Sequence, residues 1–207
     1  MKTYTKYSDG ELISLISKGN HDAYAEIVNR HTDRFLALAF RTLHNRGDAE
    51  DVVQAAFIKL WQKPQSWDGT KSQFTTWFYR VVVNACHDHR RKYKRILDVD
   101  DQIIEFNVEP VDSEQISLET LQHEAWQRKC LEVAISKLPA SQKDALNLVV
   151  YSELPQKQAA EIMGVSLKAL ESLLVRAKRS MAKTVSALNS DSSLVKTKIS
   201  GVNSSSL

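Results

Sequence analysis

Apolar residues recur every three or four positions through the first part of the chain, which predicts helices joined by short breaks. The run Ser8-Asp9-Gly10-Glu11 has the form of a capping box before a first short helix. Asp48 is placed to cap a third helix, which we expect to end near Pro64. An aromatic and then basic stretch predicts a fourth helix to about Arg95. The pattern therefore predicts one helical domain over 8–95.

The pattern changes after this domain and then returns. Residues 96–117 include Pro110, lack Lys and Arg and are rich in carboxylates, which predicts a flexible acidic linker. Helical spacing resumes near Leu118 and predicts a second helical domain over 118–186. Residues 187–207 are serine-rich, so we expect a disordered tail. The expected fold is all-α, with two small domains and no internal repeat.

The sharpest local signal lies between Leu154 and Met181, where a helix-turn-helix is predicted. Gly164 suits the left-handed backbone of a tight turn, and Ser166 can cap the helix that follows. Leu170 and Leu173 are expected to face inward. The second helix of such a pair enters the DNA major groove. The alternative is an ordinary antiparallel helix pair with a solvated basic face.

The helix predicted from residue 73 begins with aromatic residues and ends with basic ones. Exposed aromatics beside cations suit single-stranded DNA, because bases stack on the rings and the cations hold the backbone. The alternative is that the aromatics are core and the basic run is a solvated helix end. Cys86, His87 and His89 do not converge on one point of a helix, so neither a metal nor a cofactor is expected.

Composition narrows the class of protein. The formal net charge is only +3, but it is unevenly distributed, with the linker acidic and the helix ends basic. Two separated cysteines and a polar N-terminus are typical of a reducing compartment without secretion. No long apolar run predicts membrane insertion. We therefore expect a cytoplasmic protein, and the chain shows no arrangement of residues typical of an enzyme.

Four segments in one order resemble the extracytoplasmic-function (ECF) sigma factors of bacterial RNA polymerase. SDGELISLISKGNHDAYAEIVNRH resembles the start of the family's first domain, and GDAEDVVQAAFIKLW resembles its polymerase-docking helix. FTTWFYRVVVNACHDHRRKYKR resembles the segment that melts and reads the −10 element. The stretch from LPASQKDALNLVVYSELP to LLVRAKRSM resembles the domain that reads the −35 element. The resemblance thus implies regions 2 and 4 of a sigma factor.

The resemblance also implies partners and roles for individual residues. The partners would be core RNA polymerase, promoter DNA (duplex at −35, melted at −10) and an anti-sigma factor. Core polymerase would be bound by Asp51, Gln54, Phe57 and Trp61. The −10 element would be bound by Phe74, Trp77, Asn84, His87, Asp88, Arg90 and Arg91. The −35 element would be bound by Lys168, Glu171, Ser172, Val175, Arg176, Lys178 and Arg179.

The chain departs from the family's usual form within the predicted −35 helix. Glu171 and Leu173 stand where the family often has basic residues, and a carboxylate such as Glu171 could accept from a cytosine amino group. The acidic linker has two possible roles: it could occupy the RNA exit path of the polymerase, as the resemblance implies, or it could be a solubilising spacer. Two other functions stay open: a helix-turn-helix regulator, or a sigma-like adaptor that binds an anti-sigma factor without initiating transcription.

Overall fold

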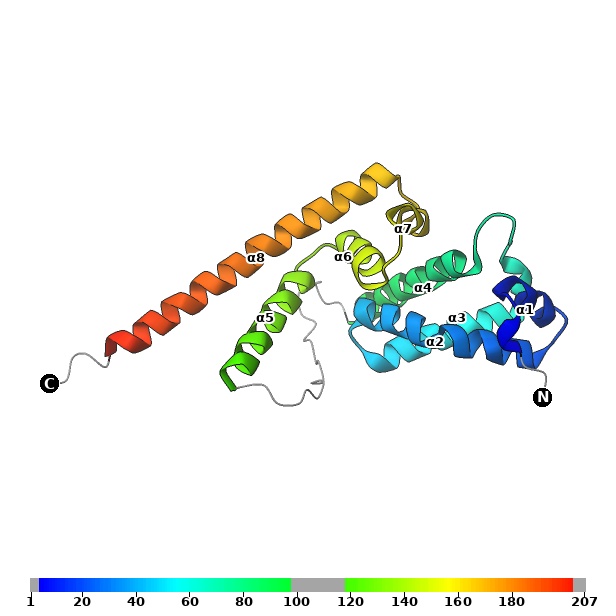
Figure 1. The fold of residues 1–207 in the computed structure, drawn as a ribbon, viewed down its shortest axis with the longest axis horizontal. Helices are drawn as coiled ribbons and strands as arrows, with labels where there is room; N and C mark the ends of the chain where they lie inside the picture. The colour runs from blue at the N-terminus through cyan, green and yellow to red at the C-terminus, as the bar shows by residue number, and fades with distance from the viewer. Residues whose placement is uncertain (1–3, 98–117, 203–207) are drawn as a thin grey trace. The chain divides into compact units, whose positions relative to one another are not determined.

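The structure is a computed structural model that describes residues 4–97 and 118–202, and the side chains of residues 4–93 and 126–190. The described residues form helices and contain no strand (Figure 1). Eight are α-helices: α1 Asp9–Ile16, α2 His21–Leu43, α3 Arg46–Gln62, α4 Phe74–Leu97, α5 Leu118–Ser136, α6 Ala140–Leu146, α7 Gln156–Met163 and α8 Leu167–Val202. Short 3-10 turns lie at Tyr4–Lys6 and Pro64–Ser66, and a π-helical turn, η3, spans Asn147–Tyr151. The all-α fold expected from the sequence is confirmed.

Local capping defines where the first three helices begin. Ser8 and Glu11 form the predicted capping box at α1, with reciprocal hydrogen bonds between side chains and backbone. The start of α3 differs from the prediction. Asn45, and not Asp48, is the cap, and its side chain accepts the Asp48 N–H at 3.0 Å. Asp48 instead lies in the first turn, where its charge is favourable near the positive end of the helix dipole.

Aromatic rings join α2, α3 and α4 into one core. Phe78 is fully buried, and its ring centroid lies 4.7 Å from that of Phe35 and 4.8 Å from that of Phe57. Tyr79 is buried beside Phe35 at 4.9 Å. Edge-to-face ring pairs stabilise such a core beyond their buried area. This core fixes α3 and α4 as rigid supports, so their outward side chains have defined positions.

The predicted helix-turn-helix is present as α7, a short turn and α8. Gly164 ends α7 in the left-handed region with φ of 67°, and the Ser166 hydroxyl accepts the Ala169 N–H at 3.2 Å. Leu170 is fully buried as expected. Leu173 is only half-buried, and Leu174 supplies the second inward contact, because a four-residue step keeps it on the same helix face.

The described chain forms two compact units. The first contains α1 to α4 and also Asp144–Leu170, which includes η3 and α7. The sequence placed Asp144–Leu170 in the second predicted domain, and the boundaries 8–95 and 118–186 stay a prediction. The second unit contains α5 and the rest of α8, where the Trp126 indole donates to Asn189 at 3.4 Å. No described helix is long and apolar enough to cross a membrane.

Helix α8 continues beyond the point at which the sequence predicted disorder. The tail predicted over 187–207 is helical as far as Val202. The reason is visible in the spacing of Met181, Val185 and Leu188, which extends the apolar face, while serine lowers helix propensity by only a few tenths of a kcal/mol. The predicted linker lies outside the described residues, except that Ile96 and Leu97 end α4.

Candidate functional site

The outer face of α3 brings together part of the predicted polymerase-binding set. Asp51 and Gln54 are exposed three positions apart, on the side of α3 opposite its buried residues. Ile58 follows on the same face and is 44% exposed, although it is a large aliphatic side chain. Sequence reasoning missed Ile58, because in the sequence it is one more apolar residue of a helical run. We call Asp51, Gln54 and Ile58 the α3 face.

Two other members of that set are placed differently. Phe57 is 4% exposed and packs against Phe78, so in this structure it is a core residue, and its contact with core polymerase stays a prediction. The helical period turns Phe57 inward once Val53 and Leu60 face the core. Trp61 is half-buried, with its ring 4.6 Å from His21 and 5.1 Å from Tyr24.

Helix α4 presents a polar stripe along its outer side. Asn84, Asp88 and Arg91 are exposed at positions i, i+4 and i+7, and Arg91 forms an ion pair with Asp88. Trp77 is half-buried, seven residues before Asn84 on the same face. The structure therefore brings four of the predicted −10 residues onto one face, which we call the α4 stripe. An aromatic ring, an amide and a cation in one line match what single-stranded DNA requires.

The remaining predicted −10 residues lie off the exposed part of this stripe. Phe74 is 3% exposed, and its ring centroid lies 5.3 Å from that of Phe78, so it is a core residue here, and its contact with DNA stays a prediction. Arg90 is half-buried. His87 is half-buried, and its Nε2 lies 2.9 Å from a carboxylate oxygen of Asp144. The hydrogen bond to Asp144 raises the pKa of His87 above its ordinary value.

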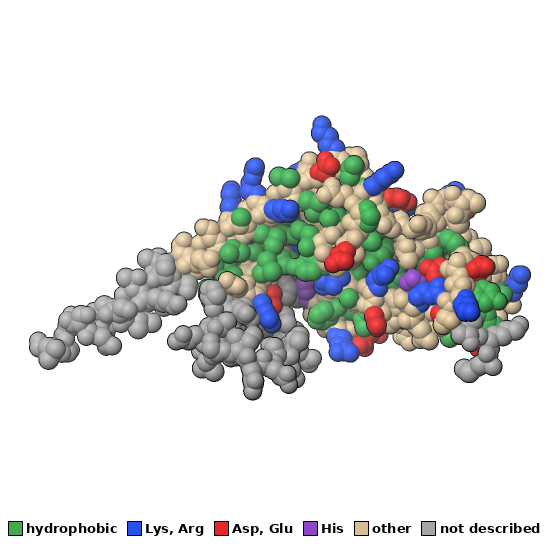
Figure 2. Space-filling model, viewed as in Figure 1, with side chains coloured by type: hydrophobic (Ala, Val, Ile, Leu, Met, Phe, Trp, Pro, Cys, Tyr) green, Lys and Arg blue, Asp and Glu red, His purple; other side chains and the backbone are tan. Residues whose placement is uncertain are grey.

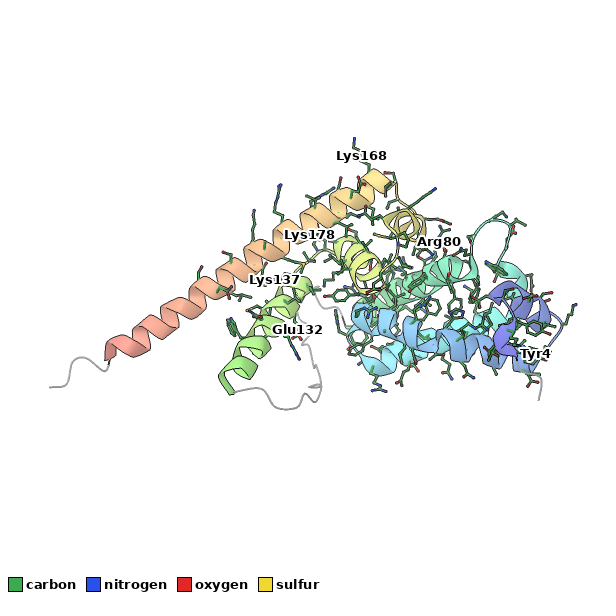
Figure 3. All side chains as sticks on the ribbon, viewed as in Figure 1. Tyr4, Arg80, Glu132, Lys137, Lys168 and Lys178 are labelled. Carbon is green, nitrogen blue, oxygen red and sulfur yellow. The ribbon has the colours of Figure 1, made fainter. Side chains whose placement is uncertain are left out.

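The predicted −35 residues share the outward side of α8. Lys168, Glu171, Val175, Arg176, Lys178 and Arg179 are exposed, and Ser172 is half-exposed. Figure 3 shows Lys168 and Lys178 extending away from the ribbon, and Figure 2 shows Lys and Arg side chains projecting from α8. Val175 is 58% exposed, so its methyl groups are accessible to an apolar group such as a thymine methyl. We call these seven residues the α8 face.

The described residues contain no group of side chains placed to hold a metal ion. No group of three or more His, Cys, Asp or Glu side chains within 4–93 and 126–190 is placed to hold a metal ion. Burial raises the pKa of the Cys86 thiol to about 12, so it stays protonated and is a poor nucleophile at neutral pH. The predicted site residues that are accessible lie on exposed helix faces.

Comparison with known proteins decides between the remaining classes. The family model of sigma-70 region 2 matches residues 27–96, and that of sigma-70 region 4 matches residues 128–181. The ECF RNA polymerase sigma factor SigW of Bacillus subtilis is 29% identical over 83% of this chain and 93% of its own length. The chain belongs to the ECF sigma factors. RNA polymerase sigma-H factor of Pseudomonas aeruginosa is a further relative, 26% identical over 89% of this chain and 97% of its own length.

Solved structures show the same fold for this sigma factor. CnrH, in complex with the cytosolic domain of CnrY, matches 86% of this chain and 97% of its own, at a TM-score of 0.60 and 21% identity. RpoE of Bartonella quintana, in complex with the anti-sigma factor NepR, matches 79% of this chain and 96% of its own, at a TM-score of 0.60 and 21% identity. With the two family models and the curated relatives, the chain is a transcription initiation factor with sigma regions 2 and 4.

Proposed function

We propose that the three exposed faces divide the work of this sigma factor among core polymerase, the −10 element and the −35 element. In this proposal the α3 face docks on core RNA polymerase. The α4 stripe holds the melted −10 strand, with Trp77 as a stacking surface and Asn84 as a base-directed amide. The α8 face reads the duplex −35 element. The chain directs the polymerase and performs no chemistry itself.

The observation that supports the proposal most strongly is the exposure of the α8 face. All seven residues that the sequence assigned to DNA contact at the −35 element have side chains at least partly accessible to solvent, while Leu170, Leu174 and Ala177 face inward. The Arg176 Nε donates to the Ser172 carbonyl at 3.3 Å, which holds the guanidinium along the helix surface. Guanidinium groups give bidentate contacts to guanine.

The division of contacts also explains how two small domains can select a promoter. Neither domain needs high affinity alone, because both are mounted on one enzyme and each raises the effective concentration of the other at the DNA. We expect the carboxylates of the acidic linker to be attracted to a basic channel of the polymerase. Free chain should then bind duplex DNA weakly and lose that binding steeply as salt increases.

We extend the proposal to an anti-sigma factor as partner and to the cytoplasm as location. Two proteins of the same fold, CnrH and RpoE of Bartonella quintana, were solved as complexes with a partner protein, and for RpoE that partner is an anti-sigma factor. An anti-sigma factor acts by covering surfaces that polymerase or DNA would bind. The α3 face and the α4 stripe are such surfaces.

Transcription reconstituted from pure components tests the proposal. Core polymerase and this chain are combined on a genomic library, and the transcript start sites are mapped. Asp51→Ala with Gln54→Ala should remove the transcripts without unfolding the chain, because both side chains are exposed. The control is Asp33→Ala, an equally accessible carboxylate on α2. Tight, specific promoter binding by the chain without polymerase would contradict the proposal and favour a stand-alone regulator.

A further inference from the structure

Glu171 is the one carboxylate among the seven described residues of the α8 face, and four of the others are cationic. It lies in the second turn of the helix that begins at Leu167. Its side chain is exposed, and its carboxylate makes no hydrogen bond or ion pair with another side chain described within 4–93 or 126–190. Both carboxylate oxygens are therefore available to accept from a bound partner.

The carboxylate of the α4 stripe shows the pairing that Glu171 lacks. Asp88 forms an ion pair with Arg91, three residues after it on the same helix. The positions three and four residues after Glu171 hold aliphatic side chains. Lys168, three residues before Glu171, extends away from the ribbon (Figure 3). The charge of Asp88 is thus compensated within the chain, and that of Glu171 is not.

A carboxylate on a helix that enters the DNA groove has an electrostatic cost. B-DNA carries one negative charge per about 1.7 Å of its axis, and these charges repel a carboxylate that approaches the base pairs. The cationic neighbours of Glu171 on α8 reduce this repulsion but do not remove it. A hydrogen-bond donor on the DNA must therefore offset the cost, because a desolvated carboxylate without a donor is strongly disfavoured.

The four bases differ in what their major-groove edges offer to a carboxylate. Cytosine presents its N4 amino group, which donates. Guanine presents two acceptors, N7 and O6, and thymine presents the acceptor O4 beside a methyl group, so both are unfavourable partners. Adenine presents a donor beside an acceptor, a pattern that a glutamine amide matches and a carboxylate matches only in part. Cytosine is therefore the base that best satisfies Glu171.

We infer that Glu171 determines specificity at the −35 element by accepting a hydrogen bond from the N4 amino group of one cytosine, and that it disfavours guanine and thymine at that position. The inference rests on the proposed function, in which the α8 face reads the duplex −35 element. It deepens that function by assigning one base of the element to one side chain. Replacement of this cytosine by guanine should weaken promoter binding by about 10- to 100-fold.

Selection from a promoter library tests the assignment. The full chain and core polymerase are incubated with promoters whose −35 region is randomised, and the bound DNA is sequenced. The native chain should enrich cytosine at one position on one strand of the element. Glu171→Gln should change the preference at that position to adenine, and Glu171→Ala should remove it, while the other positions keep their preferences. The control, Glu161→Gln at an exposed carboxylate of α7 outside the α8 face, should leave every position unchanged.

A change of one group on the DNA provides a second readout. N4-methylcytosine still pairs with guanine, but a methyl group replaces the amino hydrogen that faces the major groove. Placed at the selected cytosine, it should weaken binding of the native complex by about 10-fold and leave binding of the Glu171→Ala complex unchanged. On promoters whose −35 element is replaced, Glu171→Gln should bind at least as tightly as the native chain, because it removes a negative charge. A residue with only a structural role would not produce these opposite effects on two DNAs.

The inference and the proposed function fail in different ways. If the native complex enriches an upstream element and both Glu171 variants keep its preference at every position, the inference is overturned and the proposed function stands. Equal weakening of the native and Glu171→Ala complexes by N4-methylcytosine overturns the inference as well. If the native complex enriches no upstream element, the proposed function is contradicted and the inference falls with it. A loss of preference confined to one position in Glu171→Ala, with a change to adenine in Glu171→Gln, supports the inference.

Discussion

The exposed isoleucine on the α3 face gives the most specific prediction about polymerase binding. Ile58 is 44% exposed and lies beside Asp51 and Gln54. Full burial of an isoleucine side chain contributes about 1.5–3 kcal/mol. Covering the exposed 44% should therefore contribute about 0.7–1.3 kcal/mol to the docking of α3 on core polymerase.

Ile58→Ala should weaken binding to core polymerase by about 3- to 10-fold, which is the equilibrium equivalent of that free energy. Stability should change little, since the lost atoms are mostly those in contact with water. The assay is a titration of labelled chain with core polymerase, followed by fluorescence anisotropy at one fixed salt concentration. Thermal unfolding of both proteins checks that the fold is unchanged.

The matched control is Leu131→Ala on α5, where the side chain is 43% exposed but lies outside the α3 face. It removes a similar apolar surface and should leave the affinity for polymerase as it is. Equal affinities for Ile58→Ala and the native chain, with both proteins folded, would refute the argument that Ile58 is exposed in order to dock. Equal losses in Ile58→Ala and Leu131→Ala would show that the effect is not specific to α3.

The remaining predictions concern the core, the turn before α8, the His87–Asp144 contact and the −35 face. Phe78→Ala should lower the free energy of unfolding in urea by about 3–5 kcal/mol, because the ring is fully buried, and a loss below about 1 kcal/mol would contradict the packing. Gly164→Ala should lower the free energy of unfolding by about 1–2 kcal/mol in the same assay. No atom lies within 4 Å of the added Cβ, so the loss comes from the left-handed backbone, and an unchanged free energy would contradict this reason. The raised pKa of His87 means that its contact with Asp144 stabilises the fold fully below about pH 6.5, and that this stabilisation is lost as the pH rises through the raised value. The free energy of unfolding in urea should thus fall as the pH rises above about 6.5, and Asp144→Asn should flatten that part of the profile. Arg176→Ala should weaken promoter binding by the polymerase complex by about 1–3 kcal/mol where the −35 element is intact, and should leave binding unchanged where that element is replaced. Equal losses on both promoters would show that Arg176 contacts a phosphate and not a base.

The parts of the fold that depend on neighbouring residues in the sequence could be predicted from it. The Ser8 capping box and the Gly164 turn are local arrangements of a few residues, and both are confirmed. The residue that caps α3 was missed by three positions, because Asn45 and Asp48 are both good caps and only the backbone distinguishes them. The helical tail departs from the prediction because its apolar spacing continues the face of α8, and a high serine content alone does not prevent a helix.

The parts that depend on tertiary packing could not be predicted. Phe57 and Phe74 belong to motifs that resemble binding segments, yet both rings face the core. A resemblance identifies a segment, but only the rotation of the helix against its neighbours decides which side chains are exposed. The Asn147 contact with α2 joins residues more than a hundred positions apart, and nothing in the local sequence of η3 indicates its partner. For the same reason, the exposure of Ile58 became visible only in the folded structure.

Site-specific photo-crosslinking in the initiation complex tests the central claim most directly. A crosslinking amino acid replaces Asn84 on α4 in one variant and Arg176 on α8 in another, and each is assembled with core polymerase on a mapped promoter. We predict that the Asn84 variant crosslinks to the non-template strand within the melted −10 region. The Arg176 variant should crosslink to duplex DNA about 25 base pairs upstream, or roughly 85 Å away. Crosslinks from both positions to the same stretch of DNA, or crosslinks that form equally well without polymerase, would contradict the account.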